Sequence, residues 1–569
     1  MTESPVHCVS VQRVWRLVSL QDSLGTPMGC RSRRSSRLRP VSLGGVKWIF
    51  DGEPASGRKT GGGIADHLFE RSIDSFVRET VQNSNDQRRK DRQAAARVEF
   101  AIHTLSGQFA LDFLARIDWP SLSDHLLGVT ATNALSKTRI RSVLEVTSLP
   151  RPSMNVLVLS DYGTYGLYGD ERKAEPNFAN LVRHALMTDD ANPERGGTYG
   201  LGKAVLWAHS DISTVLFHSL PTLKPGVDGR ASLDPAGARF IGRSSLASHK
   251  VGEVSYDPDG WIGDVVVDDA GREWASSVRG AVADSTLPQW LLPQRKGDDA
   301  TGTSVVIPFF GAIGREVDSS AGDLCRLILE AVNHWYWPAI QSGQLVVAVS
   351  RHENGNEIES QTADGTDGVA EFVAAWAAPT RELVEAATED RQVCEKSVMV
   401  RSPATRNSDD VPVVARHRGV EAPARLRIMR VDSATSSRHN TIALVRGPGM
   451  VVKYLRPPAL GADVPGFVGV FEAGVRHPQQ SPDHPHIERF LKASEPPAHN
   501  DWVSTTDRMH KEYMPGAGAR LDAMKTEIGA KVREALAAPV TDNDDGPAEL
   551  ARKFDLPGDK TEPATRLTM

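Results

Sequence analysis

The segment "NVLVLS", residues 155–160, constrains the fold of this chain more than any other feature of the sequence. It has the pattern of a strand that is apolar on both faces, which is typical of a central strand in a covered sheet. Further strands are predicted at "VEFAIHTL", "STVLFHSL", "WIGDVVVDD" and "TSVVIPFF", and a β-rich run at residues 142–149. Helices are predicted at 64–89 and 121–127. Helices and strands therefore alternate in a domain of the α/β or α+β class that ends near Gly311.

Length and composition limit the classes of protein that this chain can belong to. A chain of 569 residues is too long for one compact core, so we expect two or three domains. The net charge of -6 gives no global attraction to nucleic acid. The four cysteines are isolated, which suits reduced thiols, and the longest apolar runs are too short to cross a membrane. We expect a soluble cytoplasmic protein.

Shifts in composition divide the chain into five parts. Residues 1–45 are basic and serine-rich, so we expect a disordered leader or a start codon placed too early, with a nucleic-acid-binding arm as the alternative. A first globular domain is predicted at 46–315 and a smaller α/β domain at 316–475. A helical segment follows at 476–540, and the acidic, Pro- and Gly-rich tail at 541–569 is expected to be disordered.

The second domain is predicted to open with a helix at 323–337 and a strand at 344–350. Further strands are predicted at "ARLRIMRV", "NTIALVRG", "GMVVKYL" and "GFVGVFEAG". The "RGPG" between two of these strands is a turn signal that favours a hairpin. An amphipathic helix, "ARLDAMKTEIGAKVREALAA", is predicted in the helical segment that follows.

The stretch "FVRETVQNSNDQRRKD" places an acid, two asparagines and a second acid in a segment with a helical pattern. Glu79, Asn83 and Asp86 project from neighbouring turns of one face. Asparagine is a poor helix former, so its presence in mid-helix points to a chemical role. The alternative is a solvated or capping acidic face, and Asn85 has the simpler interpretation of polar surface.

Two glycine clusters follow this helix. The first, "SDYGTYGLYGD", contains Asp161, Gly163 and Gly166, and the second, "RGGTYGLGKAVLWAHS", contains Gly196, Gly197, Gly200, Gly202 and Lys203. Closely spaced glycines let a backbone wrap around a ligand and present its N–H groups. A lysine in the first turn of a helix is disfavoured unless an anion lies there, so the second cluster indicates a phosphate.

The second cluster fits G-x-x-x-x-G-K but is not a P-loop. Ala204 stands where a magnesium-binding Ser or Thr is needed. The preceding "DDANPER" is too polar for the buried strand that a P-loop follows. The strand at 155–160 resembles a Walker B strand but precedes the loop.

Taken in order, the motifs resemble those of the GHKL superfamily, which contains gyrase, heat-shock chaperones, histidine kinases and MutL. "ETVQNSND" resembles its N-box, "DYGTYG" its adenine motif, "GGTYGLGK" its second glycine box and "TGTSVVIPF" its final strand. The first glycine box departs from the family pattern by one extra residue before Gly166. The resemblance covers Glu79 to Pro308 and implies a GHKL (Bergerat) ATP-binding α/β sandwich, followed by a transducer-like domain.

The resemblance also implies roles for particular residues in magnesium-dependent ATP hydrolysis. Glu79 would be the general base and Asn83 the Mg²⁺ ligand, with Asp86 in support. Asp161 would accept a hydrogen bond from the adenine amine, and Thr303 would support that contact. The residues expected to surround the nucleotide and close over its phosphates are Gly163, Gly166, Gly197, Gly200, Gly202 and Lys203.

The transducer-like domain would supply a cation to the γ-phosphate. Lys453 is the first candidate and Arg446 the second, although a strand lysine is also typical of a solvated sheet edge. A histidine kinase is disfavoured because no phospho-acceptor helix precedes the N-box and because kinases usually lack an acid at the Glu79 position. The resemblance therefore favours hydrolysis.

The layout most resembles MORC-like and chaperone-like bacterial ATPases. This implies an ATP-dependent homodimer that acts as a clamp in a DNA-related or anti-phage defence system, with DNA, a nuclease or a helicase as partner and no membrane. A chaperone-like ATPase with a protein client remains the alternative. His477, His484 and His486 lie in a Pro-rich loop, which explains them better than a metal site does.

Overall fold

The structure is a computed structural model of the chain. It describes residues 46–62, 71–92, 94–172, 177–184, 202–223, 232–297, 300–311, 320–408, 410–447, 449–457, 464–496 and 499–537. The predicted leader at 1–45 and tail at 541–569 lie outside the described residues, as do Gly196, Gly197 and Gly200.

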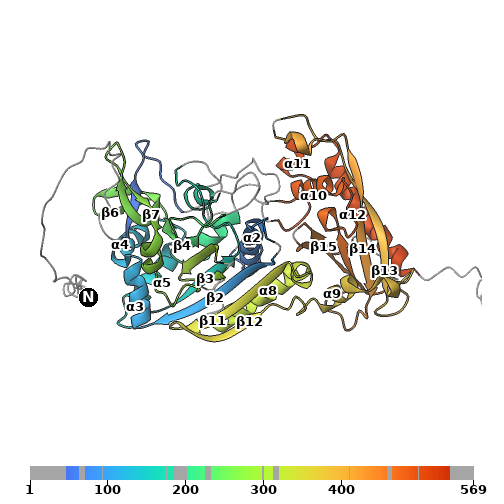
Figure 1. Cartoon of the computed structure of the whole chain (residues 1–569), viewed down its shortest axis with the longest axis horizontal. Coiled ribbons are helices and arrows are strands. Elements are labelled where there is room, and N and C mark those ends of the chain that lie inside the picture. Colours follow the sequence, from blue (N-terminus) through green and yellow to red (C-terminus); the bar gives the residue numbers. More distant parts are fainter. Residues whose placement is uncertain are drawn as a thin grey trace, which may run out of the picture. The chain divides into compact units, whose positions relative to one another are not determined.

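Two sheets organise the described part of the chain (Figure 1). The larger has twelve strands and follows the path β1-β7-β5-β4-β10-β3-β2-β11-β12, with β6 and β8 paired to β7 and β9 paired to β5. Its strands are β1 (Val46–Gly52), β2 (Ala96–Ser106), β3 (Ser153–Tyr162), β4 (Thr214–Leu220), β5 (Arg239–Ser245), β6 (His249–Val251), β7 (Val254–Val267), β8 (Glu273–Ser276), β9 (Val278–Arg279), β10 (Gly302–Pro308), β11 (Leu345–Glu353) and β12 (Asn356–Thr362). Together with the helices they form a mixed α+β fold, as predicted.

The central position predicted for residues 155–160 is confirmed. β3 pairs antiparallel with β10 on one side and with β2 on the other. Val156 and Val158 pack in one hydrophobic cluster, whereas Leu157 and Leu159 pack in another. Both faces of β3 are therefore covered, which explains why the segment shows no alternation of apolar and polar residues.

Helices cover the two faces of the larger sheet. The helices that precede or follow its strands are α2 (Ile73–Asp86), α3 (Gln108–Arg116), α4 (Trp119–Thr130), α5 (Lys137–Thr147), α6 (Val205–Ala208), α7 (Gly280–Thr286) and α8 (Ala321–Gln341). Apolar residues of α2, α6 and α8 join the cluster that contains Leu157, while those of α3, α4 and α5 join the cluster that contains Val156.

The β-rich run predicted at 142–149 is wrong, because most of it lies in helix α5. Ile140 and Val143, three residues apart, are the buried residues of this helix. β-branched residues at a helical spacing were misread as a strand, since packing against α4 outweighs their intrinsic strand preference.

The helix and strand predicted to open the second domain exist, but β11 belongs to the larger sheet. It runs parallel to β2, from the Leu345–Ala96 pair to the Glu353–Thr104 pair. Helix α8 lies against β11 (Figure 1). The predicted boundary near residue 315 therefore precedes the last two strands of this sheet.

The smaller sheet has five strands in the order β13-β14-β17-β15-β16. Its elements, with the helices near it, are α9 (Ala370–Ala377), β13 (Val393–Ser402), β14 (Val420–Arg430), β15 (Thr441–Arg446), β16 (Met450–Leu455), β17 (Phe467–Glu472), α10 (His484–Ala493), α11 (Asp507–Glu512) and α12 (Ala517–Leu536). The hairpin predicted at "RGPG" is confirmed by the antiparallel pairing of β15 and β16. In the described residues, no helix combines the length and hydrophobicity needed to span a bilayer.

A matched pair of substitutions tests the place of β11 in the core. Val347 is fully buried, whereas its neighbour Val346 is 40% exposed on the opposite face. Val347→Ala should lower the free energy of unfolding by about 2 kcal/mol because it leaves a cavity. Val346→Ala should change it by no more than about 0.5 kcal/mol. Urea unfolding followed by circular dichroism checks this, and equal effects of the two substitutions would contradict the assignment of β11 to the sheet.

Candidate active site

Helix α2 carries Glu79 into the interior of the protein. Ser72 caps the helix by accepting a hydrogen bond from the Ser75 N–H at 3.2 Å. Glu79 is only 5% exposed, and its Oε1 has no hydrogen-bond partner among the described residues. Burial raises the pKa of the Glu79 carboxyl group, while the nearby His499 and Arg78 act in the opposite direction. The result is a buried acid whose Oε1 accepts no hydrogen bond from the described residues.

Gly202 lies directly against this carboxyl group. A Cβ atom added at Gly202 would stand 2.1 Å from Glu79 Oε2, which no real side chain tolerates. Any other residue at position 202 would therefore displace the acid. The structure thus brings together the first predicted motif, on α2, and the end of the second glycine cluster.

The other two predicted residues of α2 differ in their surroundings. The side chain of Asn83 is exposed, whereas Asp86 is half-buried. Asp86 interacts electrostatically with Lys492 of α10, which is 6% exposed. Burial lowers the pKa of Lys492 to about 8, and Asp86 opposes that shift. Sequence reasoning missed Lys492, because its interaction with Asp86 joins two segments that are distant in the chain.

Asp161 lies at the end of β3 and has one anchored oxygen. Its Oδ1 accepts hydrogen bonds from the Thr303 N–H, at 2.9 Å, and from the Thr164 hydroxyl group. No hydrogen bond from the described residues reaches Oδ2. Burial raises the pKa of Asp161, and Arg295 is the first of the groups that oppose the shift. One carboxylate oxygen of Asp161 is thus fixed by two hydrogen bonds.

The glycines after Asp161 shape the turn around it. Gly163 has φ 68° and donates its N–H to Thr301 O at 2.8 Å. Gly166 has φ 65°, and an added Cβ would lie 2.8 Å from Ser219 Oγ. That Ser219 hydroxyl lies 3.1 Å from Thr303 Oγ1, so the predicted residues Asp161, Gly163, Gly166 and Thr303 share one cluster.

Lys203 directly follows Gly202, but its ammonium group donates hydrogen bonds to main-chain oxygens. Nζ donates to His184 O at 2.6 Å and also to Asn180 O. Burial, followed by the charge of Arg243, lowers the pKa of Lys203 to about 8. The structure therefore shows Lys203 holding the end of the helical turn at Ala179–Arg183.

The two cations predicted for the γ-phosphate both form ion pairs in this structure. Lys453 pairs with Asp501, and its side chain is 37% exposed. Arg446 is buried and pairs with Glu495, with Nη2 at 2.5 Å from Oε2, and with Glu488 at 3.4 Å. Glu495 also lies 2.8 Å from His499 Nδ1, the histidine that influences Glu79.

Arg78, which sequence reasoning missed, ties α2 to the smaller sheet. Its Nη1 donates to Val451 O at 3.4 Å and to Val452 O at 3.3 Å, and its Nη2 donates to His499 O. Its guanidinium carbon lies 4.1 Å from the ring centroid of Trp335. Since Arg78 is the residue next to Glu79, the position of the acid is linked to β16 and to the segment after α10.

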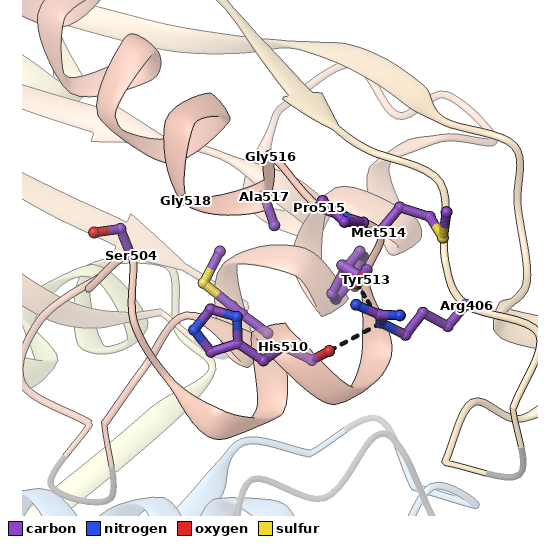
Figure 2. Close-up of a pocket in the computed structure, with 10 residues that line it drawn as sticks. Arg406, Ser504, His510, Tyr513, Met514, Pro515, Gly516, Ala517 and Gly518 are labelled. Carbon is purple, nitrogen blue, oxygen red and sulfur yellow. Dashed lines mark hydrogen bonds between the residues drawn. The ribbon is translucent and has the colours of Figure 1, made fainter.

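A pocket of about 240 Å³ lies elsewhere, at the N-terminus of α12 (Figure 2). Arg406 forms part of its wall and donates from Nε to the main-chain oxygens of His510, at 2.9 Å, and Tyr513, at 2.8 Å. None of the predicted site residues lines this pocket. Glu79 and Asp161 therefore lie outside this pocket.

Comparisons with known proteins give matches among solved structures but none among protein families or curated proteins. No protein-family model matches the chain, and no curated protein matches it. A solved crystal structure of the N-terminal domain of a DNA repair protein matches 83% of this chain and 97% of its own, with 9% sequence identity and a TM-score of 0.32. At that TM-score the match does not establish a shared fold or a shared function.

Proposed function

We propose that this chain binds and hydrolyses ATP with magnesium, in the manner implied by its resemblance to the GHKL superfamily. The observation that carries the proposal is Glu79, a buried acid with a hydrogen-bond-free Oε1 that lies against Gly202. A general base works best when its pKa is raised towards the working pH and when its oxygen is free to take a proton from water. Burial supplies the first condition and the uncommitted Oε1 the second.

Asp161 supports adenine as the base of the nucleotide. Because Oδ1 is anchored by Thr303 and Thr164, Oδ2 has a defined direction and can accept a hydrogen bond from an exocyclic amine. Guanine carries an acceptor at the corresponding position and would be repelled by a carboxylate. Asp161 therefore favours ATP over GTP.

The residues present fit magnesium that arrives with a triphosphate. Among the described residues, no cluster of three His, Cys, Asp or Glu side chains could hold a metal ion. Magnesium usually takes few protein ligands and keeps phosphate oxygens and waters. The exposed amide of Asn83 suits such a site and adds no negative charge. When bound, magnesium offsets the charge of the phosphates.

Side chains of this protein would activate the water and bind the phosphates. Glu79 would orient the attacking water and take its proton at Oε1. Lys203 is the cation that we assign to the phosphates, because it directly follows Gly202, which lies against Glu79. It would need to release the main-chain oxygens of Asn180 and His184 to serve this role. Lys492, which interacts with Asp86, is a further cation for that side of α2. Lys453 and Arg446 would need to leave their carboxylate partners to serve this role.

The bonds of Arg78 support a conformational switch. They connect the residue beside Glu79 to main-chain oxygens of β16 and of His499, so a shift of the smaller sheet would displace the acid. Hydrolysis should then be slow and coupled to movement. We therefore include in the proposal a nucleotide-driven dimer clamp, as implied for a DNA-related or defence system.

The role of Glu79 can be tested with an isosteric change. Glu79→Gln keeps the size of the buried side chain but removes its ability to take a proton. The variant should bind ATP within about threefold of the parent and lose turnover by about 10²-fold or more. Calorimetric binding and phosphate release measure the two quantities. Asp74→Asn, an exposed acid on the same helix whose amide oxygen can still accept the Trp335 indole N–H, is the control. Turnover of Glu79→Gln at the parent rate would show that the base is another residue.

The clamp can be tested by mass measurement in solution. Nucleotide binding and dimer formation reinforce each other if the dimer binds ATP more tightly than the monomer does. A non-hydrolysable ATP analogue should therefore produce a dimer, whereas ADP and nucleotide-free protein should remain mainly monomeric. A chain that is monomeric in all three conditions, above its nucleotide affinity, contradicts the clamp and leaves a monomeric ATPase.

A further inference from the structure

Arg295, which belongs to none of the four motifs, contacts the end of the central strand. It lies between α7 and β10. Nη1 donates to the main-chain oxygen of Asp161 at 2.7 Å, and Nη2 donates to Ser304 Oγ at 3.0 Å. The guanidinium carbon also lies 4.8 Å from the ring centroid of Tyr162. One guanidinium group thus joins β3 to β10 at the level of the candidate base-recognition residue.

Gly302 makes this approach possible. A Cβ atom at position 302 would lie 2.2 Å from Asp161 O and 2.7 Å from Arg295 Nη1. The residue also has φ +148°, which disfavours other side chains. The glycine that precedes Thr303 therefore leaves room both for the carbonyl group of Asp161 and for the arginine that binds it.

The charges around Asp161 make Arg295 the cation that matters most to it. Among the described residues, no ion pair joins Arg295 to a carboxylate, and Asp161 is the charge that contributes most to holding Arg295 protonated. On β2, Glu99 forms an ion pair with Arg97 and accepts a hydrogen bond from the Tyr162 hydroxyl group. The opposite charges of Glu99 and Arg97 offset each other. On β4, His218 lies 3.1 Å from Asp284, and burial lowers the pKa of that histidine.

We propose that Arg295 is a positioning residue for base recognition, which holds the end of β3 against β10 and places its charge beside Asp161 so that Oδ2 accepts from an amino-purine. This inference rests on the proposed function and deepens it. An ionised Asp161 offers only acceptors, which match the exocyclic amine of adenine. A protonated Asp161 would offer a donor, which matches the carbonyl oxygen of guanine instead. The arginine thereby sets the preference of the site through charge.

The direction of the pH dependence follows from the same contact. Burial raises the pKa of Asp161 and Arg295 lowers it, so loss of the arginine raises that pKa further. Affinity for ATP is full above the pKa of Asp161 and falls as the pH drops through it. Without Arg295 the loss should therefore begin at a higher pH.

The experiment measures ATP and GTP affinity of the full chain between about pH 5.5 and about pH 8.5. In Arg295→Gln, the pH at which ATP affinity falls should move up, which should appear as a loss of about tenfold in ATP affinity at the acid end. The preference for ATP over GTP should shrink over the same range. Arg295→Lys keeps the charge and should keep the parent profile, whereas Lys296→Gln removes an exposed neighbouring cation and should change nothing.

A second measurement needs no nucleotide. The ¹³C carboxyl resonance of Asp161, assigned by its absence in Asp161→Asn, gives the titration midpoint in the free protein. A midpoint that moves up in Arg295→Gln but not in Lys296→Gln supports the inference. An unchanged midpoint, or an Arg295→Gln variant that is weaker by the same factor at every pH, overturns it even if ATP binds. A parent protein that binds no ATP at any pH overturns the proposed function and, with it, the role in base recognition.

Discussion

The burial of both faces of β3 is the constraint on which the rest of the structure depends. Val156 and Val158 require one layer of helices and Leu157 and Leu159 require the other, so β3 must lie inside the sheet. That position brings Asp161, near the end of β3, beside β10. There it accepts hydrogen bonds from the Thr303 N–H and from Arg295. The geometry of the candidate site is thus a consequence of ordinary core packing.

Contacts made by single groups then connect this sheet to the rest of the chain. Gly202 lies on the Glu79 carboxyl group, and Arg78, one residue earlier, is bound by main-chain oxygens of β16 and His499. A buried arginine that has carbonyl groups as its acceptors is sensitive to their position, because an unpaired charge in a protein interior is costly. The structure therefore links the candidate base mechanically to the smaller sheet.

Local patterns predicted much of the fold and the motif residues of the site. The central strand, the strands beside it, α2, the β15–β16 hairpin and α12 all carry their own periodicity or turn signal. The predictions that failed concern segments whose structure depends on residues far away in the chain. Residues 142–149 form most of a helix because Ile140 and Val143 pack inward, and β11 pairs with β2 across more than two hundred residues of chain. Arg78, Arg295 and Lys492 were missed because their roles come from contacts that no spacing encodes. Asn83 was proposed as the Mg²⁺ ligand from the motif alone, and the structure shows its side chain exposed on α2.

The central claim is that Asp161 recognises the adenine base of a nucleoside triphosphate. Calorimetric titration of the parent protein and of Asp161→Asn with ATP and with GTP, at one neutral pH with magnesium, tests it most directly. The account predicts that the parent binds ATP at least about tenfold more tightly than GTP, and that Asp161→Asn loses this preference with most of its ATP affinity while it keeps its fold. Equal affinity of the parent for the two nucleotides, or unchanged ATP binding by Asp161→Asn, would contradict the account.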